Sequence, residues 1–218
     1  MQAARSSILT PVLVGGCILI LINFAIRASF GVFQIPIANE LGWLRSDFSM
    51  AIAIQNLAWG IGQPLFAAMA ERFGDRKAIV LGALFYAFGL VMSSYAITPG
   101  QHHLLEVFVG FGIAGTGFGV ILAVVGRAAS PENRSMALAI VIAAGSAGQV
   151  VGAPTAEWML GFMSWQSVFV VFAAAILTAL LVPPMLRAPH RPDGPENEET
   201  MRDPGQGVPR SDLYGHAL

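Results

Sequence analysis

The chain has 218 residues, of which 55% are apolar and 11% are charged. A soluble domain carries about 25% charged residues, so this chain lacks the polar surface that water requires, and its composition indicates a membrane-embedded bundle. Twelve Lys or Arg against thirteen Asp or Glu give a net charge of -1, which leaves no basic surface for nucleic acid and excludes it as a partner.

Charge-poor apolar runs of about 20 residues have the length that a helix needs to cross a bilayer. None of the runs in this chain alternates polar with apolar residues, as a transmembrane strand would. The sequence therefore predicts an all-α membrane protein with six transmembrane helices. The predicted helices cover residues 11–37, 48–70, 78–97, 104–125, 135–160 and 165–186.

Basic residues fall almost entirely on one side of these predicted spans, and Lys and Arg of short loops are retained in the cytoplasm. Arg45 alone falls on the opposite side, so we expect a multi-pass protein of a bacterial-type inner (plasma) membrane with both termini in the cytoplasm. Residues 1–10 are then a cytoplasmic N-terminus, 11–186 the six-helix bundle, and 187–218 a disordered cytoplasmic tail or the start of a central linker. The basic residues on the cytoplasmic side are Arg5, Arg72, Arg76, Lys77, Arg127, Arg134, Arg187, Arg191, Arg202 and Arg210.

Arg27 is the one basic residue that belongs to neither side, because it lies about 24 Å along the first predicted helix from Pro11. A charge at this depth costs about 2.5 to 3.5 kcal/mol on insertion scales. Two interpretations stay open: a structural one, in which Arg27 pairs with Glu106 or with backbone carbonyls, and a functional one, in which its guanidinium binds the carboxylate of a small organic anion.

Other polar side chains of the predicted spans can line a cavity around Arg27. For each of them, a hydrogen bond between helices explains the residue at least as well as contact with a substrate. We select Gln55, Asn56 and Gln149 as substrate-binding candidates beside Arg27. Asn23 and Gln34 are the remaining polar residues of this kind.

The loop between the second and third spans has the order acid, Arg, Phe, Gly and then a charged triplet. This order resembles the signature loop of the major facilitator superfamily, with Glu71 in place of the aspartate and Asp75 in place of the first basic residue. The resemblance implies the N-terminal six-helix half of that fold, a 3+3 inverted repeat, in which the loop acts as a gate. The gating residues it implies are Glu71, Arg72, Gly74, Asp75, Arg76 and Lys77.

Two further stretches resemble the oxalate/formate antiporter and monocarboxylate porter branch of this superfamily. The first runs from Arg27-Ala28-Ser29-Phe30-Gly31 to Trp43, and the second from Ala51 to Gln63-Pro64. The resemblance implies an anionic substrate. A short match between Ser29-Phe30-Gly31-Val32 and Gly117-Phe118-Gly119-Val120 suggests the inverted repeat.

The fifth predicted span carries three glycines and a proline, Gly145, Gly148, Gly152 and Pro154. This pattern resembles the one that many antiporters of the superfamily show at that helix. Close helix packing explains it equally well, because small residues let backbones approach.

Other chemistry finds little support in the sequence. We interpret His102 and His103 as polar turn residues. A proton carrier would be an acid buried near the middle of the membrane, and we place Glu106 and Glu157 near the outer surface. We therefore expect exchange or facilitated movement of the anion without a proton carrier in this half. We predict no catalytic residue, no cofactor and no metal. A rhomboid-type protease is excluded, since no predicted span holds a histidine or the Gly-any-Ser-Gly sequence.

The function that we expect is secondary transport of a small organic anion, such as a mono- or dicarboxylate, by alternating access. A lone half cannot enclose a substrate, so its partners are the bilayer, the anion and either a second six-helix half or another copy of the chain. The alternatives are an incomplete transporter fragment without activity and a six-span homo-oligomeric channel or scaffold.

Overall fold

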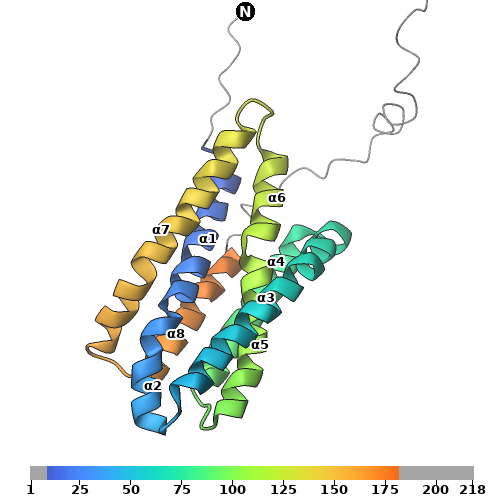
Figure 1. Ribbon diagram of the computed structural model, residues 1–218. Coiled ribbons are helices and arrows are strands. Elements are labelled where there is room, and N and C mark those ends of the chain that lie inside the picture. The colour runs from blue at the N-terminus through green and yellow to red at the C-terminus, as the bar shows by residue number, and fades with distance from the viewer. Residues whose placement is uncertain (1–8, 182–218) are drawn as a thin grey trace, which may run out of the picture. The chain divides into compact units, whose positions relative to one another are not determined.

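The computed structural model describes residues 9–181, and within them the chain folds into six helical rods (Figure 1). Each rod coincides with one of the six predicted spans, although the second and fourth rods are longer at both ends and the third begins and ends a few residues earlier. The rods are α1 (Pro11–Ser29) with η1 (Phe30–Phe33) and α2 (Gln34–Leu41); α3 (Arg45–Phe73); α4 (Asp75–Ser93); α5 (Pro99–Thr116) with α6 (Phe118–Ala128); α7 (Arg134–Leu160); and α8 (Trp165–Leu177) with η2 (Thr178–Leu181). The predicted tail, 187–218, and most of the predicted N-terminus lie outside the described residues.

The helix ends follow from local sequence. Thr10 caps α1 by accepting a hydrogen bond from the Leu13 amide, and Pro11 occupies the first helical position, where its missing N–H is not needed. Thr98 and Gln101 form a reciprocal capping box at the start of α5. Gly74 ends α3 with φ at 95°, a conformation that permits the immediate turn into α4.

Four of the rods are long and apolar enough to cross a membrane: Pro11–Leu41, Asp75–Ser93, Pro99–Ala128 and Arg134–Leu160. Helix α8, Trp165–Leu177, is apolar but shorter. Helix α3 has 29 residues, enough to cross, but polar residues such as Gln55, Asn56 and Gln63 make it less apolar. Such a helix is stable in a bilayer when its polar side chains face other helices instead of lipid.

Two of the predicted continuous helices contain a break. The first rod changes to a 3-10 turn at Phe30–Phe33, and the fourth changes to an extended conformation at Gly117, with φ at -95° and ψ at -167°. These are the positions of the four-residue match between the first and fourth spans. The match therefore falls on a helix break in both spans, at the positions where the predicted inverted repeat aligns them.

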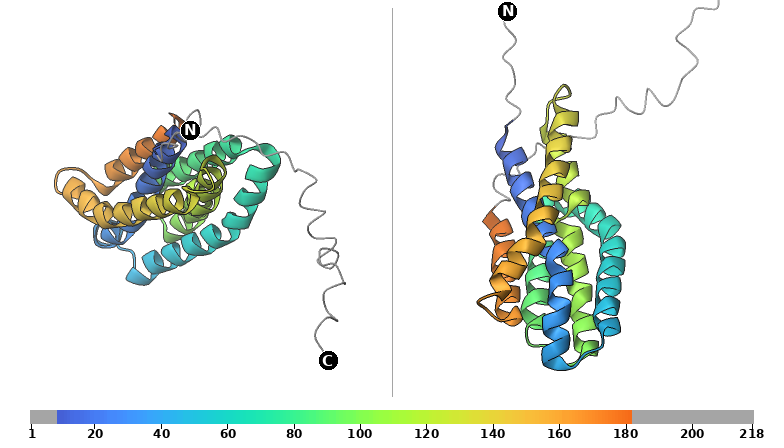
Figure 2. Two further views of the ribbon diagram at one scale, coloured as in Figure 1. Left: turned by 90° about the horizontal axis from the view of Figure 1, so that it is seen from above. Right: turned by 60° about the vertical axis from the view of Figure 1, so that its left-hand side comes forward.

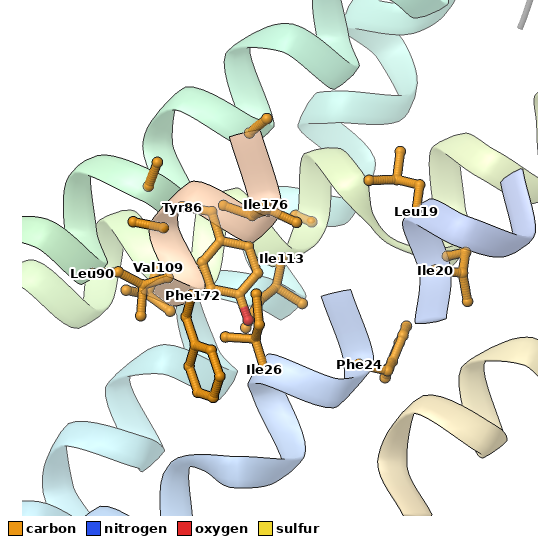
Figure 3. Packing of buried hydrophobic residues seen from close by; sticks show 14 of the residues in the cluster. Leu19, Ile20, Phe24, Ile26, Tyr86, Leu90, Val109, Ile113, Phe172 and Ile176 are labelled. Atoms are coloured by element: carbon orange, nitrogen blue, oxygen red, sulfur yellow. The ribbon is translucent and has the colours of Figure 1, made fainter. Parts of the chain in front are cut away.

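The helices pack as pairs that are separated in sequence. Helix α1 lies along α7, whereas α5 packs on both α3 and α4, and α8 covers α4 (Figures 1 and 2). Tyr86 lies in the centre of the core formed by α1, α4, α5 and α8, with Ile26, Ile113 and Ile176 around its ring (Figure 3). Its hydroxyl donates to the Asn23 carbonyl at 3.4 Å.

Glycines set the closest helix approach, between α1 and α7. A Cβ added to Gly148 would collide with the Leu21 carbonyl oxygen, and one added to Gly152 would collide with that of Ala25. At Gly145 the added atom would meet Phe118 at 2.5 Å and Ile20 at 2.9 Å. Close packing alone is therefore a sufficient physical reason for all three glycines of α7.

Replacement of Gly152 by Ala should destabilise the bundle, because α1 and α7 must move apart to admit the methyl group. Overpacking of this kind costs about 1–3 kcal/mol. Thermal unfolding of the purified protein in detergent measures the effect as a lower midpoint. Gly60→Ala in α3 is the matched control, since nothing lies within 4 Å of the added atom; equal midpoints for the two variants would contradict this packing.

Candidate functional site

Arg27 lies in the last turn of α1, close to the break in that helix. Its Nη2 donates to Oδ1 of Asn56 at 2.8 Å, and its Cζ lies 4.6 Å from the centre of the Trp59 ring. Both partners come from α3. This helix thus binds the guanidinium through one hydrogen bond, to Asn56, and one cation–π contact, to the Trp59 ring. The Asn56 amide in turn donates to the Ile52 carbonyl at 2.9 Å, which fixes its oxygen toward Arg27.

No carboxylate of the described residues, 9–181, pairs with Arg27. The predicted pairing of Arg27 with Glu106 is therefore wrong, because Glu106 is bound by Gln55. The contacts of Arg27 between helices are made instead with Asn56 and Trp59. Two shielded donors, Nε of Arg27 and Nε1 of Trp59, have no hydrogen-bond partner. A buried donor without a partner is uncommon, and two of them beside a cation are suited to an oxygen anion.

The other predicted site residues separate into different surroundings. Gln55 is buried and points to Glu106, so it does not share the site of Arg27, whereas its neighbour Asn56 does. Gln149 is exposed on α7, next to Gly148, which packs on α1. Asn23 and Gln34 make hydrogen bonds between elements, Asn23 to Thr116 and to the Ile113 carbonyl, and Gln34 to the Arg45 carbonyl.

Trp59 is a part of the site that the sequence analysis missed. Its spacing of three residues from Asn56 was the available signal, because residues three apart share a helix face.

The loop between α3 and α4 contains one specific ion pair. Asp75, at the start of α4, accepts from Nη2 of Arg127 through both carboxylate oxygens, each at 2.6 Å. The residue that departs from the superfamily pattern thus joins the start of α4 to the end of α6. Glu71, Arg72, Arg76 and Lys77 are exposed, and Arg72 lies over the ring of Phe73 at 5.4 Å.

The opposite end of the bundle holds a buried polar cluster that the sequence analysis misread. His102 and Glu106 lie on α5, not in a turn, and their side chains are 2% and 0% exposed. The predicted depth of Glu106 stays a prediction; what the sequence analysis did not foresee is that the side chain is enclosed, with 0% exposed. The spacing of four residues after the Thr98 cap was the available signal, because it places both side chains on one helix face.

The apolar helices are those of an integral membrane protein, and a profile of the Major Facilitator Superfamily matches residues 16–216. The chain therefore belongs to the major facilitator superfamily, a family of membrane transporters.

The relatives that the chain matches are named for different kinds of transport. The chain is 25% identical to monocarboxylate transporter 13 of Bos taurus over 75% of the chain and 38% of the relative. It is 30% identical to the multidrug resistance protein MdtH of Photorhabdus laumondii, over 71% of this chain and 39% of MdtH. It is 25% identical to the probable anion transporter 3 of Arabidopsis thaliana, over 75% of this chain and 32% of that relative. The chain thus spans about a third to two fifths of these relatives.

Solved structures agree on the fold. The partially occluded, inward-open xylose transporter XylE from E. coli superimposes with a TM-score of 0.70, at 13% identity, over 88% of this chain and 50% of that one. A bacterial homologue of the human lysosomal transporter Spinster superimposes with a TM-score of 0.66, at 21% identity, over 84% of this chain and 45% of that one. The described helices are thus one six-helix half of the superfamily fold, as predicted.

The Asp75–Arg127 pair is open to a direct test by a double-mutant cycle. Its side chains are 21% and 34% exposed, so we expect a coupling energy of about 0.2–1 kcal/mol that decreases at high salt. Unfolding of Asp75→Asn, Arg127→Gln and the double variant measures it. Exchange of the two residues, Asp75→Arg with Arg127→Asp, should restore part of the loss; strictly additive single effects would show that the pair contributes nothing.

Proposed function

We propose that the protein is a secondary transporter, or one half of it, that carries a small organic anion by alternating access, with Arg27 as the anion anchor. The observation that carries this proposal is a guanidinium within a membrane span that has no carboxylate partner among residues 9–181 and one unsatisfied N–H. A carboxylate would satisfy the charge and the geometry together, because guanidinium and carboxylate match through two hydrogen bonds.

Trp59 and Asn56 restrict how such an anion approaches. The indole ring lies under Cζ of the guanidinium, and Asn56 takes one of its terminal nitrogens, so the N–H of Nε is the shielded donor that is left without a partner. The Trp59 N–H is the second shielded donor. We propose that this arrangement favours a compact carboxylate over a bulky or neutral solute, and that Gln149 of α7 is a further ligand contact.

The names of relatives support an anionic substrate at the level of class. The names of monocarboxylate transporter 13 and probable anion transporter 3 refer to anions, whereas the name of MdtH refers to multidrug resistance. The shielded cation at Arg27 favours the anion transporters.

Transport needs a second six-helix unit opposite this one. Asn56 of α3 and Gln149 of α7 are exposed, and polar side chains of membrane-spanning helices are unfavourable in contact with lipid. We propose that a second half, or another copy of the chain, covers them and completes the cavity. Without that unit, the chain is a fragment that binds but does not translocate.

Binding of a radiolabelled carboxylate, with lactate and oxalate as probes, tests the anchor in the purified protein in nanodiscs. Arg27→Gln should weaken binding about ten-fold or more, since a hydrogen bond to a charged group is worth about 1.5–3 kcal/mol. Arg45→Gln is the matched control, because Arg45 is exposed at the start of α3. Equal binding by Arg27→Gln and the wild type would overturn the role of Arg27.

Membrane orientation is a separate proposal, based on the distribution of basic residues. The α3–α4 turn and Arg127 should lie in the cytoplasm, and the start of α5 should lie outside. A reporter fused after Lys77 should behave as cytoplasmic and one fused near Gln101 as external. The reverse labelling would invert the topology.

A further inference from the structure

The buried pair of His102 and Glu106 is not used by the anion site. Nε2 of His102 lies 3.5 Å from Oε1 of Glu106, which is longer than a hydrogen bond. The other carboxylate oxygen accepts from Nε2 of Gln55 at 2.7 Å. Gln55 is itself 1% exposed, so all three side chains are enclosed by the bundle.

Aromatic rings close the pair off from the nearer end of the bundle. The ring of Trp43 lies 5.5 Å from the imidazole of His102, and that of Phe48 is stacked on it at 6.0 Å. Both imidazole nitrogens and Oε1 of Glu106 have no hydrogen-bond partner. Three unpartnered polar atoms in one enclosed pair are exceptional, because buried polar groups are nearly always bonded.

The charges around the pair do not supply a counterion. From α3 it meets the neutral Gln55; on α5 its neighbour is His103, whose Nε2 lies 2.8 Å from the Asp47 carbonyl oxygen. The Asp47 carboxylate accepts from the Leu44 amide, and Tyr86 of α4 packs on Gly112, further along α5. An unprotonated pair would thus leave a bare carboxylate in the interior, whereas one bound proton makes the pair neutral.

We propose that His102 and Glu106 form a proton-binding site that takes up one proton with the transported anion. The proton adds to Nδ1 of neutral His102 and gives an imidazolium. The Nε2–H bond then breaks as the O–H bond forms at Oε1 of Glu106. The products are a neutral imidazole with hydrogen on Nδ1 and a neutral carboxylic acid, and release follows the same steps in reverse.

Coupling to the anion follows from helix α3, and this step rests on the proposed function. Gln55, which binds Glu106, and Asn56, which binds Arg27, are adjacent residues of that helix, so the two sites share one element. A carboxylate bound at Arg27 adds a negative charge to this region of low dielectric constant, and that charge disfavours the ionised form of Glu106. Anion and proton therefore bind with positive cooperativity, which is reciprocal by thermodynamic linkage.

Infrared spectroscopy tests the proton site without any need for transport. On titration of the full chain in nanodiscs, the carbonyl stretch of a protonated carboxylic acid should appear, with a shift in D2O, and be lost in Glu106→Gln. His102→Asn should displace the titration midpoint, and His103→Gln should leave it unchanged. An identical titrating band in wild type and Glu106→Gln would overturn the site. Nitrogen-15 NMR of histidine in the unsubstituted chain checks the same site, and a His102 signal unchanged over the titrated range would also overturn it.

Proton uptake on addition of lactate, in weakly buffered solution near the titration midpoint, tests the coupling. The wild type should take up protons on binding lactate and Glu106→Gln should take up none while still binding it. Loss of lactate binding in Arg27→Gln, with the infrared band retained, separates the two sites as the proposal requires. Uptake that is unchanged in Glu106→Gln would overturn the coupling even where anion binding depends on Arg27.

Discussion

The charge of Arg27 has no counterion within residues 9–181. Arg27 lies within an apolar helix, where an isolated cation costs about 2.5 to 3.5 kcal/mol on insertion scales, and α3 compensates part of that cost through Asn56 and Trp59. The helix break at Phe30–Phe33 follows within one turn. One N–H of the guanidinium and the N–H of the Trp59 indole are left without a hydrogen-bond partner in the same part of the chain, and we propose that a bound anion accepts from them.

Helix α3 connects the two polar centres of the bundle. Gln55 and Asn56 are adjacent in sequence but point in different directions, one to Glu106 and the other to Arg27. The helix is less apolar than the other long rods for this reason: Gln55 is buried against Glu106, whereas Asn56 is exposed and bound to Arg27. One helix thus holds a basic centre at Arg27 and an acidic centre at Glu106 through two adjacent side chains.

Hydropathy was sufficient to predict the six helices, because each rod is long and most are strongly apolar, and the α3–α4 loop was sufficient to indicate the superfamily. The breaks at Phe30 and Gly117 were not predicted as breaks, although the four-residue match fell on both. Asp75 departed from the pattern, and only the spatial fold shows that its partner is Arg127, 52 residues away. His102 was misread because polarity beside Pro99 and Gly100 suggests a turn, whereas the Thr98 cap starts a helix there.

The central claim is that a carboxylate occupies the free edge of Arg27. Solid-state NMR in lipid tests this directly, with nitrogen-15 arginine in the protein and lactate labelled with carbon-13 at its carboxylate. A dipolar contact between the carboxylate carbon and Nε of the arginine, absent in Arg27→Gln, is the predicted result. A contact that persists in that variant, or bound lactate with no contact to any arginine nitrogen, would contradict the claim.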